Sequence, residues 1–143
     1  MISLETARKL KQAGLVWKPA LFDFFAIPDR DLDDRVFVIA DMPVMIENLF
    51  GAQVVSFQGA SEWALDSLVT SELVWLPSET QLRQCLQESL LAAGNSGLRL
   101  TANLAGYSCE FKGKAGRMSF RASQACEAYA MALLNILEKR HLG

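Results

Sequence analysis

Apolar residues recur along this chain with two periods, one typical of helices and one typical of strands. The helical period predicts helices over residues 3–12, 41–50, 61–70, 78–93 and 123–140. Ser78 and Gln81 form a capping-box pattern at the start of the fourth predicted helix. Asp41 is the expected cap of the second, with Gly51 after its end.

Strands are predicted where β-branched and aromatic residues cluster between turn residues. They cover residues 22–27, 36–40, 53–57, 73–76, 98–104, 107–111 and 118–121. The run 36–40 is apolar throughout, which is typical of a strand covered on both faces. Helices and strands do not alternate regularly. We therefore predict an α+β fold, with a mixed or antiparallel sheet and helices, that ends in a β-β-β-α unit.

The length of 143 residues fits a single domain, residues 1–143. Residues 1–96 carry seven basic and thirteen acidic side chains, whereas residues 97–143 carry seven basic and three acidic ones. The net charge changes sign at the glycine-containing segment 94–97. This suggests a subdivision into an acidic α/β portion, 1–94, and a basic β-β-β-α portion, 95–143. Net charges of opposite sign on the two portions steer partners or favour contact between copies of the chain. The alternative is that these charges are simply scattered over a solvated surface.

The sequence contains no signal-peptide pattern and no apolar run long enough to cross a bilayer. Its three cysteines are widely spaced, which suits a reducing compartment. We therefore expect a cytoplasmic protein with no membrane partner. The hydrophobic fraction of 51% is high, and predicts either a well-filled core or an apolar surface at a subunit interface.

The last three predicted strands carry a cluster of basic residues, namely Lys112, Lys114, Arg117 and Arg121. Aromatic residues lie on the same strands at Tyr107, Phe111 and Phe120. Basic residues interleaved with aromatics bind phosphates and stack on bases, which predicts a nucleic-acid-binding site. Two alternatives stay open: a solvated hairpin whose aromatics belong to the core, and a surface for docking a protein.

Two acidic patterns suggest chemistry. Residues 29–34 place oxygens at alternate positions, as at the start of a calcium loop, but Asp34 stands where a glycine is needed and Ala40 where a glutamate is needed. We therefore expect a solvated loop there, with a weak cation site as the alternative. Glu62 and Asp66, four residues apart, are either a surface pair or the paired carboxylates of a hydrolase.

His141 is the only histidine of the sequence, so any Ser-His-Asp or Cys-His catalytic arrangement would have to use it. We expect it instead to be a cation near the last turn of the final helix. Cys85, Cys109 and Cys126 lack the spacing of a zinc site and are expected to be small core residues. No catalytic residue, metal ligand or cofactor is predicted.

Two stretches resemble known families. Residues 3–85 resemble a family of small uncharacterised bacterial and prophage proteins, some of which carry the names HicB-like or pilus assembly. The similar segments are ETARKLKQAGL at 5–15, EWALD at 62–66 and VWLPSE at 74–79. Residues 98–140, with SQACEA opening the last helix, resemble the β-β-β-α core of HicB-type antitoxins. That resemblance implies binding to a small RNA-cleaving toxin and sometimes to DNA.

From the apolar content, the opposed charges and the missing catalytic groups, we expect a protein-binding or regulatory domain rather than an enzyme. Its partner is expected to be a second copy of the chain or another protein. The first alternative is a HicB-like module that binds RNA or DNA. The second is a carboxylate-dependent hydrolase.

Overall fold

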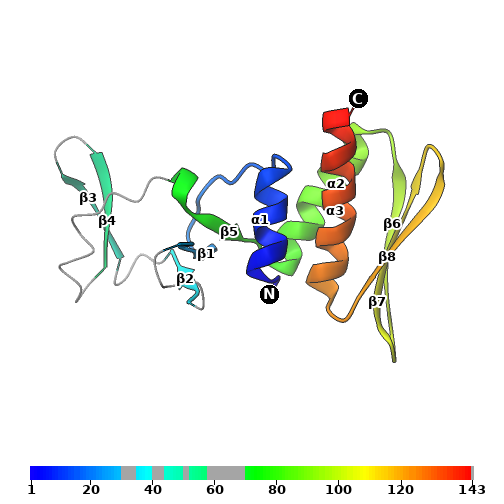
Figure 1. Cartoon of the computed structure of the whole chain (residues 1–143), viewed down its shortest axis with the longest axis horizontal. Coiled ribbons are helices and arrows are strands. Elements are labelled where there is room, and N and C mark those ends of the chain that lie inside the picture. Colours follow the sequence, from blue (N-terminus) through cyan, green and yellow to red (C-terminus); the bar gives the residue numbers. More distant parts are fainter. Residues whose placement is uncertain (30–34, 40–43, 50–51, 58–69, 143) are drawn as a thin grey trace. The chain divides into compact units, whose positions relative to one another are not determined.

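The computed structural model describes residues 1–29, 35–39, 44–49, 52–57 and 70–142 (Figure 1). The elements in chain order are α1 (Leu4–Gln12), β1 (Phe24–Ala26), β2 (Phe37–Val38), β3 (Val44–Leu49), β4 (Ala52–Phe57), the 3₁₀ turn η1 (Thr70–Glu72), β5 (Val74–Leu76), α2 (Glu79–Ala92), β6 (Ser96–Asn103), β7 (Gly106–Gly113), β8 (Gly116–Ala122) and α3 (Ala125–Leu142). The α+β prediction is confirmed, including the β-β-β-α unit that ends the described chain.

The contacts between residues divide the chain into two compact units. Unit 1 combines residues 1–16 with 76–143, and unit 2 comprises residues 17–75. The single domain 1–143, with a subdivision at residue 94, stays a prediction.

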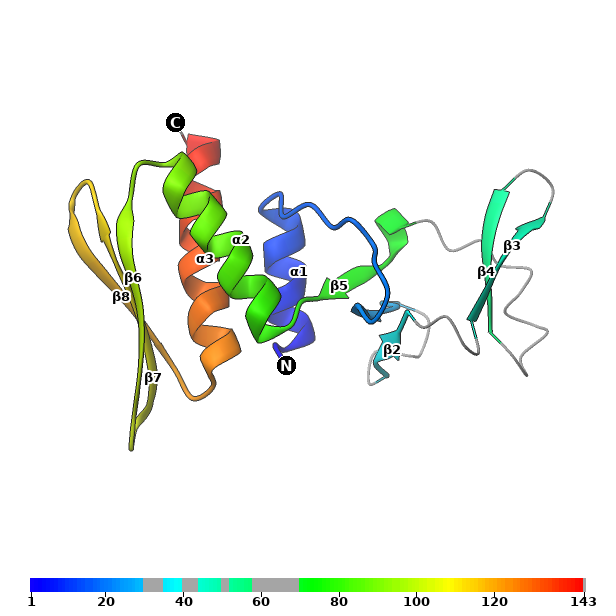
Figure 2. The ribbon, with the colours of Figure 1, turned by 180° about the vertical axis from the view of Figure 1, so that it is seen from behind.

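Unit 1 is layered. The helices α2 and α3 lie side by side on one face of the antiparallel sheet β6-β7-β8, as both views show (Figures 1 and 2). Helix α1 packs on α3 from the side away from the sheet. No other described element of unit 1 covers the opposite face of the sheet. Unit 1 therefore has one buried and one open sheet face, which is common for antiparallel sheets.

Helix α3 lies at the centre of unit 1 and is apolar around most of its circumference, as expected for a buried helix. Its buried residues are Ala125, Cys126, Ala128, Tyr129, Ala130, Ala132, Leu133, Ile136 and Leu137. The many alanines allow neighbouring elements to approach closely, so α3 contacts two helices and two strands.

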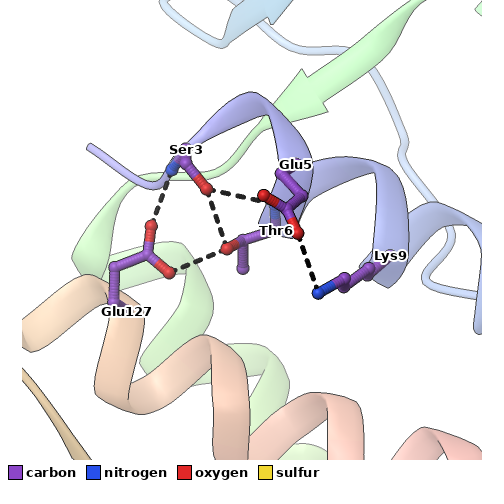
Figure 3. Close-up of polar contacts among 5 residues, drawn as sticks. All are labelled: Ser3, Glu5, Thr6, Lys9 and Glu127. Carbon is purple, nitrogen blue, oxygen red and sulfur yellow. Dashed lines mark hydrogen bonds and ion pairs between the residues drawn. The ribbon is translucent and has the colours of Figure 1, made fainter.

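Polar contacts hold α1 against α3 (Figure 3). Ser3 is the N-cap of α1, and its Oγ accepts a hydrogen bond from the Thr6 N–H at 3.1 Å. Glu127 of α3 accepts from the Ser3 N–H at 2.7 Å and from the Thr6 hydroxyl at 2.8 Å. At the other end of α1, His141 Nε2 lies 2.8 Å from the carbonyl oxygen of Ala13. Because a carbonyl only accepts, His141 is the donor there.

The predicted capping box of α2 is confirmed. The Ser78 N–H donates to Gln81 Oε1 at 2.9 Å, and the Gln81 N–H donates to Ser78 Oγ at 3.2 Å. The leucines Leu82, Leu86 and Leu90 follow at helical spacing and are all buried. The cap and the apolar stripe together fix where α2 begins and which side faces the core.

Unit 2 contains the sheet β2-β1-β5 and the antiparallel hairpin β3-β4. The core of the three-stranded sheet consists of Phe25, Ile27 and Leu73, with Trp17, Phe37 and Ile39 packed against it. Asp23 is buried and accepts hydrogen bonds from Trp17 Nε1 at 2.9 Å and from the Ala20 N–H at 3.0 Å. These bonds give the buried carboxylate the partners that it needs.

The prediction of a helix over residues 41–50 is wrong for its described part. Residues 44–49 form β3, which pairs with β4 from Val44 opposite Phe57 to Leu49 opposite Ala52. A helix of one or two turns is marginal in water, and the ladder of a hairpin satisfies the same backbone groups over the whole segment. The β-branched Val44 and Ile46 also favour a strand.

The expectation of a strand covered on both faces at 36–40 is also wrong. The strand is Phe37–Val38, and Val36 and Val38 are 51% and 38% exposed. An apolar run alone does not separate a two-sided strand from one that lies at the edge of a sheet. The predicted helix over 61–70 lies almost wholly outside the described residues. The same holds for Glu62 and Asp66, and for all of the acidic loop except Asp29.

Candidate nucleic-acid interface

Residue alternation in the sheet β6-β7-β8 sorts side chains onto its two faces, because directly opposed residues on neighbouring strands share a face. The rows that face the helices are Leu100–Cys109–Phe120, Ala102–Tyr107–Ala122 and Phe111–Met118. The rows on the other face are Arg99–Glu110–Ser119, Thr101–Ser108–Arg121 and Lys112–Arg117. We call these last eight residues the basic face.

Three of the four basic residues predicted to bind nucleic acid lie together on the basic face. Lys112 and Arg117 are directly opposed across β7 and β8, and Arg121 lies on the same face of β8. Lys114 belongs to the turn between Gly113 and Gly116 that joins these strands. All four side chains are exposed. The structure therefore brings the predicted cations to one surface and its adjoining turn.

Arg99 is a further cation on this face, and it was missed from the sequence. It lies on β6, opposite Glu110, and is exposed. The alternation Leu98–Arg99–Leu100 contains a signal for it, since a charge between two apolar residues of a strand points away from the core. Four cationic side chains thus share this face with one carboxylate, that of Glu110.

Hydroxyl groups occupy the centre of the basic face. Ser108 is 8% exposed, and its Oγ lies 3.0 Å from Ser119 Oγ on the next strand. Thr101 stands opposite Ser108 on the other side. Thr101 and Ser119 are exposed, so their hydroxyls and the long cationic side chains around them are accessible, whereas Ser108 is covered. Arginine, lysine, serine and threonine are the side chains that commonly bond phosphate oxygens.

The aromatic residues of these strands belong to the core, as one of the open alternatives supposed. Phe111 is 2% exposed, and its ring centroid lies 6.0 Å from that of Phe120 in a stacked arrangement. Tyr107 shares that face through its position opposite Ala122. These rings lie across the sheet from the cations, so the prediction that bases stack on them beside the basic residues is wrong. The basic face offers charge and hydroxyls without a stacking platform.

Two cysteines of unit 1, Cys85 and Cys109, are not activated as nucleophiles. Burial, followed by the nearby Glu110 charge, raises the pKa of the Cys109 thiol to about 11. Burial, followed by the Glu88 charge, also raises the pKa of Cys85. Both thiols are therefore protonated at neutral pH, and only the thiolate is a strong nucleophile.

The other sequence candidates do not form a site in the described residues. His141 donates to the backbone at the end of α1 and so serves the packing of that helix. Across residues 1–29, 35–39, 44–49, 52–57 and 70–142, no three His, Cys, Asp or Glu side chains gather in a way that would hold a metal ion. None of the described helices combines the length and the apolar character that a bilayer crossing requires.

The basic face is thus the surface of unit 1 on which the predicted residues converge. Comparison with protein-family models, with the curated proteins and with solved structures found no match. The two resemblances described from the sequence accordingly stay predictions.

Proposed function

We propose that this chain is a nucleic-acid-binding module that contacts backbone phosphates through the basic face. The observation that carries the proposal is the placement of Arg99, Lys112, Arg117 and Arg121 on the open face of one sheet. Strand geometry separates residues two apart by about 6.6 Å and neighbouring strands by about 4.8 Å. The cations therefore form a grid on the scale of a few phosphates. Phosphate contacts of this kind supply most of non-specific nucleic-acid affinity.

The composition of the basic face supports a nucleic acid that is recognised through its sugar-phosphate backbone. Its side chains bear positive charge or hydroxyl groups, apart from Glu110. The aromatic rings, which provide base stacking in many single-strand binders, lie on the core side. We therefore expect binding with little preference for sequence and a steep dependence on salt.

The test is fluorescence anisotropy with labelled single-stranded RNA, single-stranded DNA and duplexes, each at 50 to 200 mM salt. Binding at low salt that weakens steadily as salt rises supports the proposal. The variant Arg99→Gln examines the residue that only the structure places on this face, with Lys9→Gln on α1 as the matched control. Absence of binding at 50 mM salt, or equal loss in both variants, contradicts the proposal.

A second candidate is self-association through unit 2. Phe24 and Val38 are directly opposed on β1 and β2, and 37% and 38% of their surfaces are exposed. Phe22 and Val36 flank them and are 69% and 51% exposed. Apolar side chains that gather in this way mark protein contacts, and a second copy of the chain is the partner that we propose.

Light scattering coupled to size exclusion tests this second candidate. We expect the wild-type chain to be a dimer and Phe24→Ser with Val38→Thr to be a monomer. Leu91→Ser is the control, since Leu91 lies on α2 of unit 1 and is 77% accessible. A wild-type monomer at high concentration contradicts self-association.

A further inference from the structure

Unit 1 contains a cavity of about 310 Å³ where the C-terminal half of α3 approaches the turn between β7 and β8. Its volume lies at the lower end of the range for small-molecule sites. Apolar side chains, including Phe111 and Met118, form part of the wall. The cavity lies on the helix side of the sheet, and it reaches the edge of the basic face only at the β7–β8 turn, where Lys114 lines it.

Three cations line this cavity: Lys114 from the turn, and Lys139 and Arg140 from α3. No Asp or Glu is among the described residues that line it, and none of the three forms an ion pair within the described chain. The Lys139 ammonium lies 3.5 Å from Met118 Sδ, which is only a weak acceptor. Converging cations without a carboxylate leave the cavity suited to an anion.

The guanidinium of Arg140 is partly oriented by the protein. Its Nη2 donates to the carbonyl oxygen of Ser89 on α2 at 3.3 Å. One bond uses only part of the fork of donors that arginine carries. The remaining N–H groups are available to an anionic oxygen, and arginine is well suited to grip phosphate with two bonds.

Asn135 supplies a polar group in the same cavity wall. Its Oδ1 is buried and has no hydrogen-bond partner among the described residues. A buried carbonyl oxygen without a donor destabilises the folded chain, so such atoms call for an explanation. The terminal torsion of asparagine is broad, so the amide of this lining residue can rotate to meet a ligand in the cavity. A ligand N–H would then satisfy it.

We propose that this cavity binds a nucleotide, with the phosphate on Lys114, Lys139 and Arg140 and the base against the apolar wall, where its N–H donates to Asn135. The choice of ligand rests on the proposed nucleic-acid function, since the cavity shares its edge with the turn beside the basic face. The same chemistry is offered by a free mononucleotide and by the phosphorylated end of a strand.

Calorimetric and NMR titrations of the full chain test the proposal. The probes are guanosine monophosphate, uridine monophosphate, inorganic phosphate, and a hexanucleotide with and without a 5′-phosphate. We expect a nucleotide to bind more tightly than inorganic phosphate and to shift the amide resonances around Asn135 and Lys139. If a mononucleotide binds as tightly as the hexanucleotide, the natural ligand of the cavity is a free mononucleotide. If the 5′-phosphate raises the affinity of the hexanucleotide, the natural ligand is the phosphorylated end of a strand.

Variants make the assignment specific. Lys139→Gln should lower nucleotide affinity by about tenfold or more, because it removes a charge-assisted bond. Asn135→Asp keeps the shape of the side chain and should weaken nucleotide binding, because its carboxylate repels the negatively charged ligand. Asn135→Leu removes the amide and should weaken binding because the ligand N–H loses its acceptor. Lys9→Gln changes the charge equally on α1, away from the cavity, and should leave affinity unchanged.

The outcomes separate this proposal from the proposed function. If the hexamer binds with a salt dependence but neither mononucleotides nor the 5′-phosphate matter, the cavity proposal is overturned and the function stands. If mononucleotides bind in the cavity and no nucleic acid binds, the proposed function fails and the cavity stands. Equal affinity of wild type, Lys139→Gln and Asn135→Asp for a nucleotide also overturns the cavity proposal.

Discussion

Removing the cross-strand pair Lys112 and Arg117 gives the sharpest test of how the basic face works. Replacing both with glutamine takes two of the four cations from this face. Both side chains are exposed and point away from the core, so we expect the fold to be kept and stability to change little. The effect on binding then reports on charge alone.

The magnitude follows from the number of phosphates that the face neutralises. For single strands, the slope of log affinity against log salt is about −0.7 per phosphate contact, so four contacts give about −2.8 and two give about −1.4. Between 50 and 200 mM salt, affinity should then fall about 50-fold for the wild type but only about 7-fold for the double variant. The two curves converge as salt rises.

Anisotropy of a labelled single strand at four or five salt concentrations measures both slopes. The matched control is Lys9→Gln with Arg83→Gln, which removes two exposed cations from α1 and α2 and should keep the wild-type slope. Glu110→Gln removes the carboxylate of the basic face and should raise affinity. A double variant with the wild-type slope, or a control that loses as much, would refute the reasoning.

Three further predictions concern unit 1. Glu127→Ala removes the acceptor of the Ser3 N–H and the Thr6 hydroxyl, and should lower the free energy of unfolding by about 1–3 kcal/mol in urea titrations; an unchanged midpoint contradicts this. Because the pKa of Cys109 is raised to about 11 in the folded chain, its contribution to stability should be full below about pH 9 and lost as pH rises through 11. Urea titrations at pH 8 and 10.5 should show that decline in the wild type and a smaller one in Cys109→Ala; equal declines contradict the assignment. Gly106→Ala places a Cβ 2.5 Å from a backbone oxygen at a φ of +128°, and should cost about 1–3 kcal/mol. Gly116→Ala is its control, since φ there is +115° but the space is open, and an equal loss of stability in both would show that the close contact is not the cause.

The parts of the fold that depend on local signals were predictable from the sequence. The capping box at Ser78 and the leucine stripe behind it define α2, and alternation around the turn at 113–116 defines the hairpin of β7 and β8. Both signals act within a few residues of one another. The same alternation put Lys112 and Arg117 at one end of that hairpin.

Features that depend on which segments pair, and in which register, were not predictable. Asp41 and Gly51 resemble the start and stop of a helix, but the segment between them includes β3, whose ladder to β4 is formed only in the folded chain. The faces taken by Arg99 and by the aromatic rings depend on the register of three strands. The cavity depends on Lys114 meeting residues of α3 that follow it by more than twenty positions.

The most direct test of the account is an NMR titration of the isotope-labelled chain with a single-stranded oligonucleotide. We predict that the shifted backbone and side-chain signals map to Arg99, Thr101, Lys112, Arg117 and Arg121, and that they return to their free positions as salt is raised. Shifts confined to β1 and β2, or to the outer surface of α2, would contradict the central claim, as would a spectrum that does not change at all.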